Sequence, residues 1–258
     1  MSGAIFAANW KMHHGPAAAR ELVRAVLSRT NPREGRLLLF IPPAVSLTAV
    51  ADEVRGRDDV AVGAQNIHWE PKGAFTGEMS AALAREGGAS WVLVGHSERR
   101  HKLGETDAES GLKVAAALAA GLAPILCVGE TQEERQTGRK EAVVRRQLEA
   151  GVGALDGTAL AAVTVAYEPV WAIGTGVNAT PEDAAAMHRS VREWLSGRLG
   201  APAPNRILYG GSVTPGNAGA LLAQPEVQGV LVGGASLTAE SWVGIVETAS
   251  GSVQRSGR

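Results

Sequence analysis

Eight short apolar runs recur along the chain, and their spacing constrains the fold more than any other feature of the sequence. The runs are rich in aliphatic and β-branched residues and are too short to form helices. Because they lack the polar alternation of a half-exposed sheet, they indicate strands that are buried on both faces, as in a parallel sheet. They are residues 5–8, 37–41, 60–64, 91–94, 124–128, 162–166, 207–209 and 230–232.

The segments between these runs have the period of an amphipathic helix. Residues 17–29 and 133–151 each place apolar side chains on one face. Another helix is predicted to begin at Thr180-Pro181, an N-cap hydroxyl followed by a first-turn proline, and to stop at Gly200. In residues 107–120 the period predicts a face made of Leu112, Ala115, Ala116 and Ala119.

Strand and helix therefore alternate, with one run about every 32 residues, which is about one strand–helix unit. Eight such units in 258 residues predict an α/β fold, a (β/α)8 barrel of eight parallel strands surrounded by helices. We expect a single domain over residues 1–258, with a frayed polar tail at 250–258. A doubly wound open sheet is the alternative, but it normally has a glycine-rich turn where this chain has Asn9-Trp10-Lys11.

The composition argues against several functional classes. A formal net charge of −1 gives no field that would recruit nucleic acid or an acidic membrane. No apolar stretch approaches the ~20 residues that span a bilayer, and the first residues do not resemble a signal peptide. The single cysteine, Cys127, cannot form an internal disulfide. We therefore expect a cytoplasmic protein with no membrane or nucleic-acid partner.

Polar and titratable residues directly follow the predicted strands, at the end where barrel enzymes carry their chemistry. Asn9 and Lys11 follow the first run, His96 and Glu98 the fourth, and Glu168 the sixth. A lysine, a histidine and a glutamate that converge on one mouth indicate acid–base catalysis. Since the sequence has no metal-binding spacing of histidine or cysteine, we expect neither a metal nor a cofactor.

The seventh and eighth runs are each followed by a glycine pair, Gly210-Gly211 and Gly233-Gly234. Glycine lets backbone N–H groups approach an anion closely. Barrel enzymes frequently bind phosphate between the loops after these two strands. The sequence therefore predicts a phosphorylated small molecule as the substrate.

Six motifs stand in order along the chain: Asn-Trp-Lys-Met at 9–12, Gly-Ala-Phe-Thr-Gly-Glu at 73–78, Gly-His-Ser-Glu-Arg-Arg at 95–100, Ala-Tyr-Glu-Pro-Val-Trp-Ala-Ile-Gly-Thr-Gly at 166–176, Tyr-Gly-Gly-Ser-Val at 209–213 and Gly-Gly-Ala-Ser-Leu at 233–237. Together they resemble the triosephosphate isomerase family, and residues 167–176 alone are highly specific. The resemblance implies an isomerase of glycolysis and gluconeogenesis. Such an enzyme interconverts dihydroxyacetone phosphate and D-glyceraldehyde 3-phosphate through an enediol(ate).

The resemblance also implies a role for each residue at the mouth. Glu168 is the base that moves a proton between neighbouring carbons, and apolar contacts with Ile173 and Leu231 raise its basicity when the site closes. His96 is the electrophile that polarises the carbonyl. It acts as a neutral imidazole because a helix starting there disfavours a second proton, an effect for which this family is itself an often-cited example. Lys11 neutralises the charge of the enediolate.

The remaining implied roles concern support and phosphate binding. Asn9 adds a hydrogen-bond donor beside Lys11, and Glu98 holds Lys11 or a neighbouring residue and does not touch the substrate. Residues 169–176 form a lid that excludes water from the reaction. The phosphate is bound by Lys11, Asn9, Gly174, Ser212, Gly233 and Gly234.

Residues 65–78 have no periodic pattern, and structureless segments of this length are usually functional or disordered. The resemblance implies that this segment inserts into a second subunit. Thr76 would then reach the partner's Asn9 and the partner's Lys11, and the protein would be a homodimer. We also expect Cys127 to be a buried structural thiol, and Arg99 and Glu130 to join a polar network under the mouth.

Two other functions fit part of this pattern. A different phosphate-binding barrel, such as another sugar-phosphate isomerase or an aldolase, would share the glycine pairs. An aldolase would need a Schiff-base lysine in a strand interior, and none of the five lysines lies inside an apolar run. A non-catalytic binding barrel is expected to have lost Lys11, His96 or Glu168, and all three are present.

Overall fold

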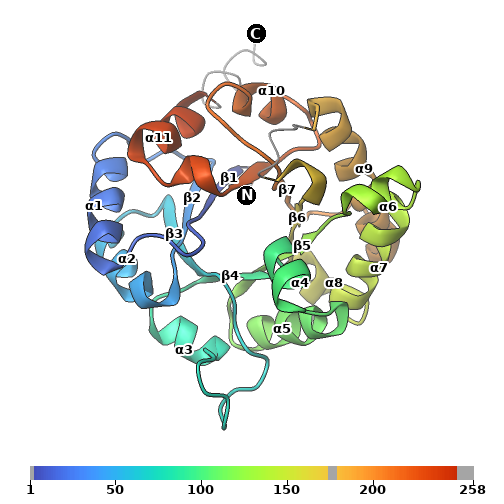
Figure 1. Ribbon diagram of the computed structural model, residues 1–258, viewed down its shortest axis with the longest axis horizontal. Helices are drawn as coiled ribbons and strands as arrows, with labels where there is room; N and C mark the ends of the chain where they lie inside the picture. The colour runs from blue at the N-terminus through green and yellow to red at the C-terminus, as the bar shows by residue number, and fades with distance from the viewer. Residues whose placement is uncertain (1–2, 174–178, 249–258) are drawn as a thin grey trace.

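The computed structural model in Figure 1 describes residues 3–173 and 179–248. Within these ranges, eight strands close into one barrel, in which each strand pairs with the next and β8 pairs with β1. All of these pairings are parallel. The predicted (β/α)8 barrel is thereby confirmed. The strands are β1 Ala4–Asn9, β2 Arg36–Ile41, β3 Val60–Ala64, β4 Trp91–Val94, β5 Ala123–Val128, β6 Thr164–Tyr167, β7 Ile207–Tyr209 and β8 Gly229–Val232.

Helices surround the barrel on all sides (Figure 1). None of the helices in the described part of the chain is long and apolar enough to cross a membrane. The α-helices are α1 Pro16–Leu27, α2 Leu47–Glu53, α3 Ala81–Glu86, α4 Ser97–Leu103, α5 Asp107–Ala119, α6 Gln132–Gln136, α7 Lys140–Val152, α8 Gly157–Ala161, α9 Pro181–Leu199, α10 Ala218–Leu222 and α11 Ala239–Thr248. Short 3₁₀ helices are η1 Ala44–Ser46, η2 Val170–Ala172 and η3 Gly234–Ser236.

The strand bounds agree with the apolar runs to within one residue at each end, except in β6. The run 162–166 places this strand too early, because Ala162 is the C-cap of α8. The predicted signals of α9 are both present. The Thr180 hydroxyl accepts the N–H of Asp183 at 3.0 Å, and Gly200 ends the helix in the left-handed conformation.

The prediction of one helix over residues 133–151 was wrong. The segment contains two helices, α6 and α7, because Gly138 has a φ of 70° and interrupts the helical backbone. Thr131 and Glu134 form a capping box that fixes the start of the first helix. The apolar period was genuine, but it belonged only to the second helix, whose buried residues include Val143, Val144 and Leu148.

Helix α5 forms as predicted but buries a different face. Its buried residues are Ser110, Lys113, Val114 and Ala117, whereas Leu112 is 50% exposed. The helix is alanine-rich, so its apolar period is weak. Its orientation follows instead from Lys113, which points inward and donates to Glu105 Oε2 at 2.6 Å. A buried ion pair therefore overrides the apolar pattern.

Alternate residues of the strands fill the barrel interior, and the other face of each strand packs against the helices. The interior cluster contains Ile5, Ala7, Leu39, Ile41, Leu93, Ile125, Cys127, Ala166, Leu208 and Leu231. Cys127 is fully buried, as expected. Burial, together with the negative charge of Glu168, raises the pKa of the Cys127 thiol well above its usual range, so the group is not a nucleophile.

Residues 65–78 form no helix or strand, and the segment projects from the rim of the barrel near α3 (Figure 1). Its base is closed by the His68 N–H, which donates to the Met79 carbonyl at 2.8 Å. Within it, the His68 ring lies 4.2 Å from the ring centres of both Trp69 and Phe75. These ring contacts order the segment without secondary structure.

Candidate active site

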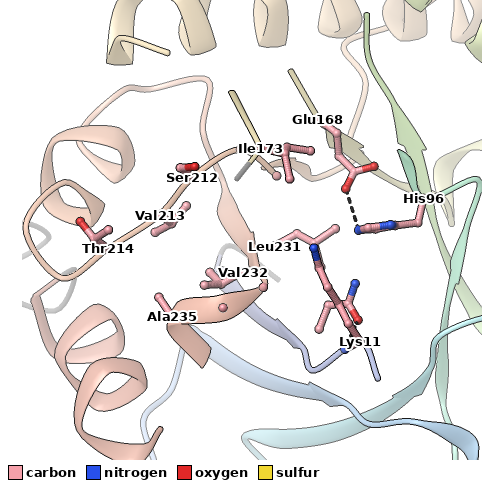
Figure 2. Close-up of a pocket in the computed structure, with 15 residues that line it drawn as sticks. Lys11, His96, Glu168, Ile173, Ser212, Val213, Thr214, Leu231, Val232 and Ala235 are labelled. Carbon is pink, nitrogen blue, oxygen red and sulfur yellow. Dashed lines mark hydrogen bonds and ion pairs between the residues drawn. The ribbon is translucent and has the colours of Figure 1, made fainter. Parts of the chain in front are cut away.

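A cavity of about 290 Å³ opens at the carboxyl ends of the strands (Figure 2). Because all the strands are parallel, the loops that follow them meet at this one end. The lining residues are Asn9, Lys11, His96, Glu168, Ile173, Gly210, Gly211, Ser212, Val213, Thr214, Leu231, Val232, Gly233, Gly234 and Ala235. Nine of the residues to which the sequence analysis gave site roles thus lie together, contributed by β1 and its loop, by the loops after β4, β6 and β7, and by β8 and its loop.

Lys11 occupies a constrained position in the loop after β1. Its φ of 51° is left-handed, which is unusual for a residue other than glycine. The Asn9 side-chain oxygen accepts the Lys11 backbone N–H at 3.1 Å, and the Gln65 amide donates to the Lys11 carbonyl at 2.8 Å. The Lys11 ammonium donates to Glu98 Oε1 at 3.1 Å. The backbone and the charge of this side chain are therefore both held before a substrate arrives.

His96 and Glu168 are buried and in direct contact. His96 is the N-cap of α4, and its Nδ1 accepts the Glu98 N–H at 3.3 Å. Since Nδ1 is an acceptor, a neutral imidazole carries its proton on Nε2. That nitrogen lies 3.0 Å from Glu168 Oε1, the contact marked in Figure 2. The other carboxylate oxygen, Oε2, accepts the Ser97 N–H at 2.8 Å.

This contact gives each group a pKa shift opposite to the one expected from apolar surroundings for Glu168 or from a helix start for His96. Burial alone raises the pKa of Glu168, but His96 and the Ser97 N–H lower it below its usual value. Burial alone lowers the pKa of His96, but the Glu168 carboxylate raises it. The sequence argument considered each group against apolar surroundings or a helix end. It did not consider that His96 and Glu168 contact each other directly.

Gly210 and Gly233 allow the side chains of Glu168 and Lys11 to pack directly against the backbone. A Cβ at position 210 would lie 2.8 Å from Glu168 Cγ, and one at position 233 would lie 3.1 Å from Lys11 Cε. A larger residue at either position would displace a functional side chain. The backbone of the glycine pairs thus forms part of the cavity wall and leaves room for the side chains of Glu168 and Lys11.

The first part of the predicted lid is tied to the ends of three strands. Glu130 is fully buried and accepts the Tyr167 hydroxyl at 3.1 Å and the Trp171 Nε1–H at 2.9 Å. The Ser212 hydroxyl donates to the Ala172 carbonyl at 2.7 Å. The lid base is therefore held by hydrogen bonds, and Ile173 beyond it lines the cavity.

Comparison with known proteins gives the family. The model of the triosephosphate isomerase family matches residues 4–249. The chain belongs to this family. The triosephosphate isomerase of Roseiflexus sp. (strain RS-1) is 47% identical over 244 residues, covering 94% of this chain and 96% of that protein. That of Symbiobacterium thermophilum is 48% identical over 248 residues, covering 95% and 96%. As a triosephosphate isomerase family member, the chain is an isomerase.

Two described residues predicted from the triosephosphate isomerase motifs, Thr76 and Glu98, do not line the cavity. Thr76 lies in the projecting segment, where it is exposed. Gly174 lies outside the described residues. Glu98 reaches the site through its contact with Lys11.

Arg99 belongs to a polar network behind His96, as the sequence predicted, but sequence reasoning missed the other members, Glu105 and Lys113. Glu105 Oε1 accepts the N–H of Gly95, the residue before His96, at 3.0 Å. Glu105 Oε2 accepts from Lys113 at 2.6 Å and from Arg99 at 2.5 Å, and these cations lower the pKa of Glu105 although burial opposes them. The signal was present in the sequence, because Lys113 is a lysine inside an apolar helical segment of an arginine-rich chain.

Proposed function

We propose that this isomerase interconverts dihydroxyacetone phosphate and D-glyceraldehyde 3-phosphate through an enediol(ate), with Glu168 as the base and His96 as the electrophile. The observation that carries the proposal is the buried contact between His96 and Glu168 beside the ammonium of Lys11. It combines a proton acceptor, a hydrogen-bond donor and a cation in one cavity. These are the groups that proton transfer next to a carbonyl requires.

In the proposed reaction, Glu168 first leaves His96 and the Ser97 N–H to reach the substrate carbon. The carboxylate then loses the groups that lower its pKa, while Ile173 and Leu231 keep it in apolar surroundings that raise its basicity. Glu168 takes a proton from the carbon beside the carbonyl and returns it to the neighbouring carbon. The lowered pKa of Glu168 in its contact with His96 is therefore compatible with a higher pKa, and so a stronger base, at the substrate carbon.

The departure of Glu168 also frees the Nε2–H of His96. That N–H can donate to the substrate carbonyl oxygen and can move a proton between the two oxygens of the enediol. The ammonium of Lys11 and the amide of Asn9 stabilise the negative charge that develops on oxygen. Each of these groups is already placed at the cavity, so little reorganisation is needed when charge develops.

The phosphate of the substrate is proposed to lie against Ser212, Gly233 and Gly234, with Gly174 completing the contact. The glycine backbone there offers N–H groups without side chains, and Lys11 packs directly against Gly233. A closed lid over residues 169–176 would exclude water from the enediolate.

The quaternary and cellular setting is part of the proposal. Met12 is 94% exposed and Val45 is 75% exposed, and both follow strands at the end from which residues 65–78 project. Large exposed apolar residues around a projecting loop favour a homodimer. We further propose a single domain over residues 1–258, testable as one cooperative unfolding transition. A cytoplasmic location is testable by cell fractionation.

Turnover of D-glyceraldehyde 3-phosphate, coupled to NADH-dependent reduction of the ketone product, tests this function. We expect wild-type activity and a loss of about 10³-fold in kcat for Glu168→Gln, because the amide cannot accept the proton. The matched control is Glu193→Gln, at an exposed position of α9. A folded wild type without turnover would refute the reaction, and equal activity of Glu168→Gln would refute the base.

A further inference from the structure

His14 has no role in the proposed reaction, yet it is held on several sides. It lies in the loop between β1 and α1, three residues after Lys11, and its φ of 66° is left-handed. Its ring lies edge-on to the buried ring of Trp10, with centroids 5.3 Å apart. The hydroxyl of Ser46, itself buried, donates to the His14 carbonyl at 2.7 Å. A strained backbone that is fixed in this way indicates that the side chain is needed where it is.

The side chain of His14 reaches across to the loop after β8. Its Nε2 lies 3.1 Å from the carbonyl oxygen of Leu237, to which it donates as the Nε2–H tautomer. Leu237 closes the turn that begins at Gly233. Within that turn, the Leu237 N–H donates to the Gly234 carbonyl at 3.1 Å and the Ser236 N–H donates to the Gly233 carbonyl at 2.9 Å.

The turn 233–237 is therefore one hydrogen-bonded unit, and Lys11 contacts it at its other end. A Cβ on Gly233 would lie 3.1 Å from Lys11 Cε and 3.5 Å from Lys11 Nζ. The loop after β1 thus touches the turn twice, through Lys11 at Gly233 and through His14 at Leu237. Two contacts at opposite ends fix both the separation and the tilt of the turn, which one contact alone would not do.

We propose that His14 is a positioning residue for phosphate binding. By holding the Leu237 carbonyl, it fixes the backbone of Gly233 and Gly234 relative to the ammonium of Lys11, and the substrate phosphate binds between them. The inference rests on the proposed function for the identity of the phosphate ligand. His14 itself does not touch the substrate.

Two substitutions of His14 by amide side chains of different length test whether its hydrogen bond to Leu237 is what matters. In His14→Gln, the amide N–H extends about as far as histidine Nε2 and can still donate to Leu237. In His14→Asn, the amide is too short, although asparagine tolerates the left-handed backbone best of the non-glycine residues. His13→Asn is the neighbour control, since His13 is exposed. Folding and oligomeric state are checked for all three variants.

The readouts are kcat, KM and the inhibition constant of inorganic phosphate. For His14→Asn we expect KM and the inhibition constant to rise about fivefold with kcat within about twofold of wild type, the pattern of lost ground-state binding. His14→Gln and His13→Asn should stay within about twofold of wild type in all three constants. Unchanged phosphate inhibition in His14→Asn, or an equal rise in His13→Asn or His14→Gln, would overturn the proposal.

The affinity of the wild type and the His14 variants for inorganic phosphate can also be measured by calorimetry, without turnover. If the wild type lacks isomerase activity but binds phosphate, and His14→Asn weakens that binding, the proposed reaction fails while the positioning role stands. If calorimetry shows equal affinity in wild type and His14→Asn, the positioning role fails whatever the activity.

Discussion

His188 is a second buried histidine, and its surroundings lower its pKa, whereas those of His96 raise the pKa of that residue. Its Nδ1–H donates to the Glu226 carbonyl at 3.0 Å, and its side chain is fully buried. Among the described residues, no carboxylate contacts its ring as Glu168 contacts that of His96. Burial therefore lowers the pKa of His188 to about 4, so the folded protein keeps this imidazole neutral where an exposed histidine would be charged.

This difference predicts a loss of stability in mild acid. Below about pH 6.5 the unfolded chain binds a proton at His188 that the folded protein does not bind until about pH 4. The free energy of unfolding should therefore fall as the pH drops from about 6.5 to 4, by up to about 3 kcal/mol from this group. Above pH 6.5 the group has no effect.

Urea unfolding at pH 7.5, 6.0 and 5.0 measures this slope. The comparison is His188→Asn, whose amide can still donate to Glu226 but does not titrate. Carboxylates such as Asp59, whose pKa Arg57 and Arg36 lower against the effect of its burial, destabilise both proteins alike in acid. The difference between the two slopes isolates His188. Identical slopes would contradict the prediction.

At the residue scale, the sequence predicted which side chains gather at the cavity but not which partner each side chain contacts. Lys11, His96 and Glu168 are identifiable because their positions after strands place them at one mouth. Their mutual contacts depend on side-chain rotation and on loops that no local pattern specifies. The same limit hid the Glu105–Lys113 pair, in which a glutamate of the loop before α5 contacts a lysine inside that helix.

Glycines show how elements begin and end. Gly138 separates α6 from α7 with a left-handed φ of 70°, and a Cβ there would meet nothing within 4 Å. Gly197 lies in α9, with open space around a Cβ and no left-handed backbone. The two positions differ in backbone conformation and not in crowding, so they form a matched pair.

Alanine at these two positions should therefore have opposite effects. Gly138→Ala should lower the free energy of unfolding by about 1 kcal/mol, because a Cβ disfavours the left-handed region. Gly197→Ala should raise it by about 0.5–1 kcal/mol, because alanine is the better helix former. Chemical denaturation at neutral pH measures both values. A destabilised Gly197→Ala or a neutral Gly138→Ala would show that the backbone explanation is wrong.

Elements were predictable where local and tertiary signals agree. The strands are short apolar runs buried on both faces, so composition alone locates them. Helix α9 has a cap, a proline and a terminal glycine, and its bounds follow. Helix α5 is different, because its alanine-rich surface leaves the burial of Lys113 to decide its orientation. The partner of Lys113 is Glu105, in the loop before the helix, so the residues of the helix alone do not show the contact.

At the scale of the whole molecule, the proposed homodimer makes the projecting segment testable. We expect wild-type protein to sediment at about twice the monomer mass of 26.7 kDa. Phe75→Asp places a charge in the apolar cluster of residues 65–78 and should yield monomers with reduced activity. Leu112→Asp, on the exposed side of α5, is the control that should remain dimeric. A fully active monomeric wild type, or a dimeric and fully active Phe75→Asp, would refute the arrangement.

Closure of the barrel between β1 and β8 has a consequence for synthesis. Ile5 pairs with Gly229, so the first strand to leave the ribosome waits for the last one. At about 5–20 residues per second, the intervening chain takes roughly 10 to 45 seconds to make. Throughout that time one edge of β1 has unsatisfied backbone groups, which is the condition that promotes strand-to-strand aggregation. The nascent chain, and not the finished barrel, is therefore the form that most needs a chaperone.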